Sequence, residues 1–335
     1  MSLIDQFADA FAVWAEARPY LSAMLDEEEM RLVLALADAG APLGAAEVAA
    51  RLGIAGADAA ALLERSYRRE IVDRSGEGYT HATFYAFLDA FAKYDPRWDD
   101  FLEADRLALD RSYLDRFIER HRDNVARKMQ GLEAENALPN DTVMLLSEIE
   151  EMIAAAEVIS VQPCDCRRLH QACSKLVETC IWFDDGARAA LDRGQGRALT
   201  HEGAVKLVRR ADHKGLMHTA DSAWRDRGLH AICNCCGDDC YPFRAAQELG
   251  SKGVWPRSRY VAAYDVDLCR QCGSCVRRCH FDAFYFTGEE VPVNGKLKQQ
   301  VAFEPANCWG CGLCANTCTE HAIEMVPLAE APPAL

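Results

Sequence analysis

The first third of the chain alternates helical hydrophobic patterns with short glycine-containing turns. Apolar residues at helical spacing predict a helix over residues 27–39, which Gly40 ends. Two further helices are expected over residues 45–52 and 57–70. Two short strand-like segments then flank the turn at residues 75–78, which is typical of a β-hairpin. The predicted order is therefore helix, helix, turn, helix and hairpin.

The middle of the chain mixes long helical patterns with short apolar strands. A charged amphipathic helix is predicted over residues 99–131, and a second helix, rich in Leu, Ile and Met, over residues 139–156. The stretch that follows indicates a strand that runs into a loop at Cys164. We then expect a helix with Thr200 as its N-cap, ending at Gly215, and a short strand leading to Cys233.

Together these patterns predict a multidomain protein of the α+β class. The element order near the amino terminus resembles winged helix-turn-helix domains. A chain of 335 residues, half of them hydrophobic, can bury two or three ordinary cores. The expected segments are a winged-helix-like domain (1–98), a helical connector (99–158), a cysteine-rich module (159–255), a ferredoxin-like domain (256–328) and a disordered tail (329–335).

The last quarter of the chain carries one cysteine pattern twice. Cys269-x2-Cys272-x2-Cys275-x3-Cys279 returns 39 residues later as Cys308-x2-Cys311-x2-Cys314-x3-Cys318. Zinc sites usually pair two Cys-x2-Cys units and need no third thiolate at the same interval, and a disulfide framework requires an oxidising compartment. The doubled spacing is therefore interpreted as the sequence signature of a two-cluster [4Fe-4S] ferredoxin.

This resemblance to bacterial ferredoxins implies a crossed set of ligands. On that pattern the first cluster is held by Cys269, Cys272, Cys275 and Cys318, and the second by Cys308, Cys311, Cys314 and Cys279. His280 and Thr319 occupy the places where proline usually follows the fourth cysteine of each repeat. Neither departure removes a ligand.

Composition places these cysteines in a reducing compartment. No apolar run approaches the roughly 20 residues of a membrane span, and the amino terminus lacks the basic region of an export signal. Sixteen cysteines in such a chain indicate metal binding and not disulfides. We therefore expect a cytoplasmic protein with no membrane span.

The negative charge is concentrated far from the ferredoxin pattern. The formal net charge is -15, and residues 1–100 hold 18 Asp or Glu against 9 Lys or Arg. Residues 256–335 hold 9 against 7. An acidic surface disfavours nucleic acid and favours a basic patch on a partner protein, although it equally serves solubility alone.

A second group of cysteines precedes the ferredoxin pattern. Its members are Cys164, Cys166, Cys173, Cys180, Cys233, Cys235, Cys236 and Cys240. Four thiolates hold one cubane, so the count allows one or two additional [4Fe-4S] clusters, and the spacing leaves the grouping open. Cys235 and Cys236 point in different directions on an extended chain and can serve different clusters. A zinc site and packed free cysteines are the alternatives.

Sequence phrases around these cysteines resemble a family of bacterial 4Fe-4S-binding proteins. The phrases are CDCRR, GLMHTADSA and ICNCCGDDCYPFRAAQELG, and the resemblance covers residues 140–325. It implies iron-sulfur binding and electron transfer without naming a reaction.

Several neighbouring residues are candidates for roles beside the clusters. Arg167 and Arg168 can donate to cluster sulfurs or form ordinary ion pairs. Three histidines between the cysteine groups are candidates for iron ligands or for structural hydrogen bonding, namely His213, His218 and His230. Trp309 is expected to shield a cluster from water.

The function that these features favour is electron transfer to or from a partner oxidoreductase. Full sets of cysteine ligands leave no open iron, and no Rossmann glycine fingerprint or P-loop appears. One alternative is a redox-sensing winged-helix regulator, whose basic residues for DNA would be Arg65, Arg68, Arg69 and Arg74. The other is an iron-sulfur enzyme with an open-iron cluster within residues 159–255.

Overall fold

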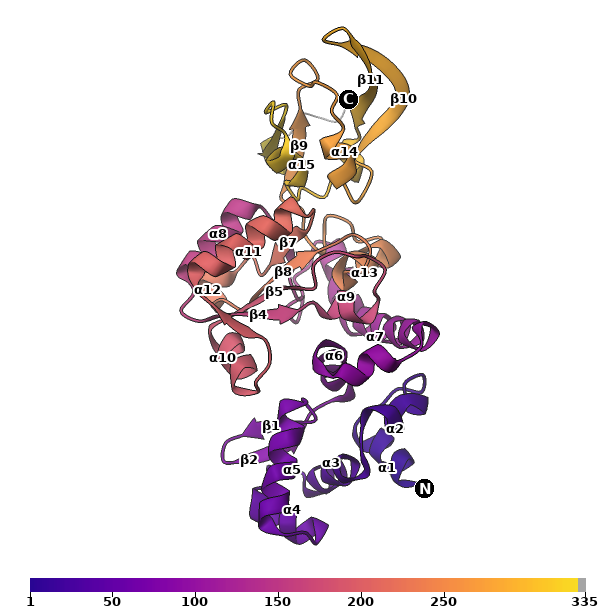
Figure 1. Cartoon of the computed structure of the whole chain (residues 1–335), viewed down its shortest axis with the longest axis vertical. Coiled ribbons are helices and arrows are strands. Elements are labelled where there is room, and N and C mark those ends of the chain that lie inside the picture. Colours follow the sequence, from indigo (N-terminus) through magenta and orange to yellow (C-terminus); the bar gives the residue numbers. More distant parts are fainter. Residues whose placement is uncertain (331–335) are drawn as a thin grey trace. The chain divides into compact units, whose positions relative to one another are not determined.

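The computed structural model describes residues 1–330, which form two compact units (Figure 1). Unit 1 contains residues 1–116 together with residues 168–170 and 190–195. Unit 2 contains the remaining described residues. The mixture of helices and strands agrees with the predicted α+β class. Among residues 1–330, no helix has both the length and the apolar character that crossing a membrane requires.

Unit 1 is mainly helical. Its elements in chain order are α1 (Leu3–Ala10), η1 (Arg18–Tyr20), α2 (Leu21–Met24), α3 (Glu27–Ala39), α4 (Ala45–Leu52), α5 (Gly56–Arg68), β1 (Val72–Ser75), β2 (Gly78–His81), α6 (Phe84–Tyr94), η2 (Pro96–Asp100) and the first half of α7 (Glu103–Met129). Helices α3 and α4 have the predicted bounds, and Gly40 ends α3 in the left-handed conformation. The hairpin β1–β2 lies at the predicted turn.

Aromatic side chains form much of the core of unit 1. Phe11 contacts Phe7, Phe84 and Phe87, with ring centroids 5.0 to 6.3 Å apart. All four rings are at most 1 % exposed. The element order from α3 to β2 is the one expected for a winged helix, and the winged-helix assignment itself stays a prediction.

A six-stranded antiparallel sheet is the centre of unit 2. Its strand order is β3-β7-β8-β5-β4-β6, with β3 (Thr142–Met144), β4 (Ile159–Pro163), β5 (Glu178–Phe183), β6 (Arg197–Leu199), β7 (Met217–Ala220) and β8 (Ala231–Cys235). Helices α8 (Leu146–Ala155) and α11 (His201–His213) pack together and share a buried cluster with β4, β5 and β8. Figure 1 shows these two helices side by side.

Three predicted boundaries in unit 2 are wrong in detail. The helix expected from residue 139 begins at Leu146, because residues 142–144 pair with β7 instead. Cys164 leads directly into the short helix α9 (Asp165–Leu169) and not into a loop. Strand β8 extends to Cys235, two residues beyond the expected end.

Other features of unit 2 agree with the sequence. Thr200 caps α11 by accepting a hydrogen bond from the backbone N–H of Gly203. The sheet region also contains α10 (Asp184–Asp192), α12 (Trp224–Arg227) and α13 (Tyr241–Leu249).

The ferredoxin-like end of unit 2 consists of two similar halves. In each half a cysteine loop leads into a one-turn helix, α14 (Ser274–Arg278) or α15 (Leu313–Thr317), and these two helices contact each other. Strand β9 (Tyr260–Tyr264) pairs with β12 (Ile323–Pro327), and β10 (Phe284–Val293) pairs with β11 (Lys296–Phe303). The short helices η3 (Pro305–Asn307) and η4 (Leu328–Glu330) complete this part. Of the tail predicted to be disordered, residues 329–330 belong to η4 and residues 331–335 lie outside the described residues.

Candidate metal centres

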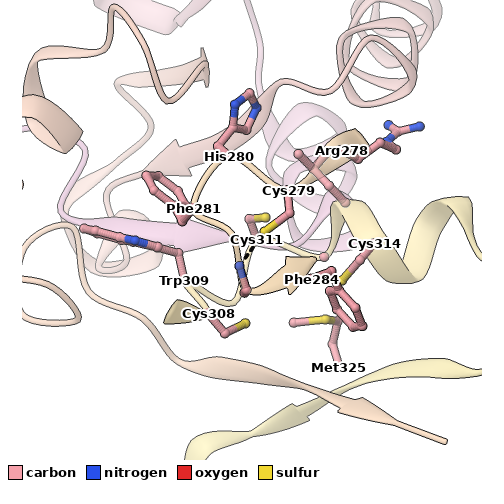
Figure 2. Close-up of a pocket in the computed structure, with 13 residues that line it drawn as sticks. Arg278, Cys279, His280, Phe281, Phe284, Cys308, Trp309, Cys311, Cys314 and Met325 are labelled. Carbon is pink, nitrogen blue, oxygen red and sulfur yellow. Dashed lines mark hydrogen bonds between the residues drawn. The ribbon is translucent and has the colours of Figure 1, made fainter. Parts of the chain in front are cut away.

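One cavity in the ferredoxin-like part is lined by four cysteines from both halves. Cys308, Cys311 and Cys314 of the second repeat lie around this cavity together with Cys279 of the first (Figure 2). The apolar side chains of Phe284 and Met325 close part of the wall. The structure thus brings together the four residues predicted to hold the second cluster.

A second cavity has the reciprocal composition. Cys269, Cys272 and Cys275 of the first repeat line it together with Cys318 of the second. The crossed arrangement follows from the chain path, because the last cysteine of each repeat comes after a one-turn helix and so leaves its own loop. That Cys269, Cys272, Cys275 and Cys318 serve as cluster ligands stays a prediction, which the geometry of both cavities fits.

Backbone N–H groups point at the sulfur atoms in both cavities. Gln271 N lies 3.3 Å from Cys269 Sγ, Gly310 N lies 3.4 Å from Cys308 Sγ, and Ala283 N lies 3.2 Å from Cys279 Sγ. Such donors stabilise a thiolate and tune the potential of an iron-sulfur cluster.

Burial makes free thiolates unfavourable at several of these cysteines unless a metal ion is bound. Burial raises the pKa of Cys275 and of Cys311 to about 12, and it raises the pKa of Cys314 well above its ordinary value. These groups are therefore protonated at neutral pH unless a metal replaces the proton. At Cys272 burial acts in the same direction, but hydrogen bonds with Ser274 outweigh it and lower the pKa.

The two cavities differ in the exposure of individual residues. Trp309 is 4 % exposed, and its ring lies 4.9 Å from the rings of both Phe243 and Phe281 beside the cavity of Cys308 (Figure 2). Trp309 thus occupies the shielding position expected for it. By contrast, Cys272 in the other cavity is exposed.

His280 follows the first repeat and Thr319 follows the second, each in the place where proline is usual. Both residues make specific contacts. The His280 ring hydrogen-bonds the carbonyl oxygen of Gly215 through Nε2 (2.7 Å), and its Nδ1 accepts from Gly237 N (3.3 Å). The hydroxyl of Thr319 accepts a hydrogen bond of 2.7 Å from Arg270. His280 therefore connects the ferredoxin-like part to the sheet, and Thr319 connects the two repeats.

A buried carboxylate strengthens the connection between the sheet and the ferredoxin-like part. Asp212, at the end of α11, accepts a 2.7 Å hydrogen bond from Asn316 Nδ2 and pairs with Arg278. Sequence reasoning missed this residue, since a single Asp at a helix end carries no motif.

Six of the eight upstream cysteines form one ring of touching side chains, here named the six-sulfur group. Each thiol interacts with the next, and the side chains of Cys164, Cys180, Cys235 and Cys240 are buried, whereas those of Cys166 and Cys233 are partly exposed. In order around the ring they are Cys164, Cys166, Cys240, Cys235, Cys233 and Cys180. Two of them come from alternate positions of β8, so their side chains share one face of the sheet.

The buried position of Arg167 suits a negatively charged group bound at this ring. The residue is 3 % exposed and donates to the backbone oxygen of Asn234 (2.8 Å) and to the Thr179 hydroxyl. Its Nε has no hydrogen-bond partner within residues 1–330. Burial opposes the charge, but the surrounding thiols, Cys164 and Cys180 first, raise the pKa of the guanidinium. A buried cation with a free donor beside six sulfurs suits a negatively charged metal-thiolate site.

The other two upstream cysteines form a separate pair. Cys173 Sγ lies 3.7 Å from Cys236 Sγ, and the carboxylates of Asp238 and Asp239 adjoin them. Cys235 and Cys236 thus belong to different groups, as their opposite directions on the chain allow.

The remaining candidate residues have other surroundings. His218 is fully buried and its Nδ1 lies 2.7 Å from Asn234 Oδ1, while His213 and His230 are exposed. Burial lowers the pKa of His218. Arg168 forms an ion pair of 3.0 Å with Asp99.

Four arginines of unit 1 that the regulator hypothesis assigned to DNA are held in ion pairs. They are Arg65, Arg68, Arg69 and Arg74. Their carboxylate partners are Asp26, Glu28, Glu29, Glu64, Asp95 and Asp192. Phosphate contacts would have to compete with these pairs.

Comparisons with known proteins support the ferredoxin-like part. A family model described as a 4Fe-4S dicluster domain matches residues 268–322. An uncharacterised ferredoxin of Methanocaldococcus jannaschii is 29 % identical over 65 residues, which are 19 % of this chain and 90 % of that protein. No solved structure matches the chain. Residues 268–322 are therefore a ferredoxin-type 4Fe-4S dicluster domain.

Proposed function

We propose that this chain is an iron-sulfur electron-transfer protein that passes single electrons through at least two [4Fe-4S] clusters to or from a partner oxidoreductase. The observation that carries the proposal is the pair of four-cysteine cavities, each lined by three cysteines of one repeat and one of the other. All eight cysteines that line these cavities lie within residues 268–322, the part of the chain that matches a dicluster domain.

In this proposal the protein residues hold and insulate the redox centres. Each [4Fe-4S] cluster, when bound, supplies a site that gains and loses one electron. Four thiolates occupy every iron of a cubane, so these residues bind no substrate. The backbone N–H groups aimed at Cys269, Cys279 and Cys308 stabilise the charge on the thiolates.

The exposed cavity is the proposed outlet to the partner. Cys272 is exposed, whereas Trp309 covers the cavity of Cys308. Arg277 donates to the Cys272 carbonyl oxygen (3.3 Å), and Lys298 donates to the carbonyl oxygen of Arg270 (3.1 Å). A partner that docks at this positively charged rim presents acidic side chains.

The remaining segments have supporting roles in the proposal. We assign residues 256–328 to the dicluster domain, residues 159–255 to a second metal-binding module, and residues 1–98 with the connector 99–158 to protein docking. The ion-paired arginines of unit 1 favour this docking role over DNA binding. Sixteen free cysteines suit a reducing cytoplasm.

Reductive titration under anaerobic conditions tests the proposal. Dithionite should reduce the full-length protein reversibly, with paramagnetic signals from two interacting clusters in the dicluster domain. Cys272→Ser should alter only one of these signals, and Cys311→Ser only the other. The proposal would be refuted if the bound iron neither accepts electrons from dithionite nor passes them on to a redox acceptor. A pair of variants that change the same signal would refute the crossed ligand sets.

A further inference from the structure

The pair Cys173 and Cys236 stands apart from both the dicluster domain and the six-sulfur group. Cys173 lies in the segment after α9, and Cys236 begins the turn between β8 and α13. Cys236 packs with Ala211 and Leu216, whereas the neighbouring Cys235 contacts the six-sulfur group. Adjacent residues at the end of a strand project to opposite sides, so one site cannot take both side chains.

Two carboxylates complete a set of four ligands around this pair. Asp239 Oδ2 lies 3.5 Å from Cys236 Sγ, and an oxygen of Asp238 lies within 4.8 Å of both sulfur atoms. The other oxygen of Asp239 accepts a 2.8 Å hydrogen bond from Ala172 N. That bond orients the carboxylate so that its Oδ2 faces the sulfurs.

Two of the distances between these atoms match edges of a tetrahedron around zinc. Bond lengths of about 2.3 Å to sulfur and about 2.0 Å to oxygen place two sulfurs about 3.8 Å apart, and a sulfur about 3.5 Å from an oxygen. The corresponding distances here are 3.7 Å and 3.5 Å. A cubane instead holds each thiolate on a different iron, so its ligand sulfurs do not touch.

The chemistry of the side chains indicates which ion suits this place. Asp239 and Cys236 are both 0 % exposed, so a sulfur and an oxygen donor lie together out of solvent. Thiolate and carboxylate together suit a borderline-soft divalent ion, and not calcium or magnesium, which prefer oxygen alone.

We propose that Cys173, Cys236, Asp238 and Asp239 bind one zinc ion in a closed tetrahedral site. The ion fixes the segment after α9 to the turn before α13. Each of these segments adjoins members of the six-sulfur group, namely Cys166 and Cys240. The turn also contacts His280, which follows Cys279 in the chain. The zinc site therefore has a structural role, because it holds together segments next to the six-sulfur group and next to Cys279 of the ferredoxin-like part.

X-ray absorption at the zinc edge of the anaerobically purified full-length protein tests the site without any substitution. We expect about one zinc per chain, with two sulfur ligands at about 2.3 Å and two oxygen ligands at about 2.0 Å. Protein without zinc after growth and reconstitution with zinc, or zinc with four sulfur ligands, would overturn the proposal.

Substitutions connect that signal to the named residues. Asp238 is exposed, so Asp238→Asn should fold normally and weaken zinc binding at least about 10-fold, while the iron content stays unchanged. Asp226→Asn, at another exposed aspartate, is the matched control and should leave both metals unchanged. Cys173→Ser should remove zinc alone. A loss of about four irons in Cys173→Ser would instead assign Cys173 to a cluster and contradict the proposal. Failure of electron transfer with zinc intact would count only against the proposed function.

Discussion

Replacing Gly310 by alanine tests how the second cysteine loop is held against β9. Gly310 lies between Cys308 and Cys311 with φ of +70°. A Cβ atom there would lie 2.2 Å from the carbonyl oxygen of Tyr260 and 2.9 Å from its carbonyl carbon, far inside van der Waals contact. Tyr260 is paired with Pro327 in the sheet β9–β12, so its backbone cannot move aside freely.

Gly312 provides the matched control in the same loop. Its φ is +79°, but an added Cβ would meet the flexible end of Leu145 at 3.0 Å and Met325 Cγ at an ordinary contact distance of 3.9 Å. The left-handed conformation alone costs about 1–2 kcal/mol for alanine. The collision adds about 1–3 kcal/mol at Gly310. We therefore expect Gly310→Ala to lower the free energy of unfolding by about 2–5 kcal/mol, and Gly312→Ala by about 1–2 kcal/mol.

Anaerobic denaturant unfolding followed by circular dichroism, together with iron analysis, measures both effects. Gly310→Ala should also lose about four irons per chain, because displacement of the loop separates Cys308 from Cys311. Gly312→Ala should keep its iron. Equal losses of stability in the two variants, or full iron content in Gly310→Ala, would refute the reasoning.

Two further predictions concern the remainder of unit 2. Asp212→Ala leaves the largely buried Arg278 guanidinium without its carboxylate and should cost about 3 kcal/mol in denaturant unfolding. Arg209→Ala, which breaks an exposed pair, should cost less than about 1 kcal/mol, and similar losses in both variants would contradict this. Burial, next to Trp255, lowers the pKa of His121 to about 4. The unfolded histidine titrates near about 6.5, so folded stability falls as pH decreases from about 6.5 to 4. His121→Phe should flatten that part of a thermal melting profile, and an unchanged slope would contradict the assignment.

The sequence predicted most where a local signal specified the structure. Gly40 and the capping threonine Thr200 marked helix ends that the structure has at the same places. These helix ends depend on residues close together in the chain. The crossed set of four cysteines that lines each cavity was instead predicted by the resemblance to bacterial ferredoxins.

What the sequence did not predict depends on strand pairing across long separations. The six-sulfur group exists because β5 pairs with β8, which places Cys180 beside Cys233. The spacing of the cysteines along the chain does not indicate how these two strands pair. Strand β3 was expected to be helical, because the apolar residues Val143 and Met144 lie before a true helix, and only pairing with β7 makes this segment a strand.

Metal analysis of the intact protein tests the central claim most directly. Iron and acid-labile sulfide should be determined per chain after anaerobic purification, with electron paramagnetic resonance of the reduced protein. Two clusters in the dicluster domain predict at least about eight irons and eight sulfides, with signals from two interacting [4Fe-4S] centres. About four irons or fewer after full reconstitution, or zinc in place of iron at the eight cysteines of the dicluster domain, would contradict the account.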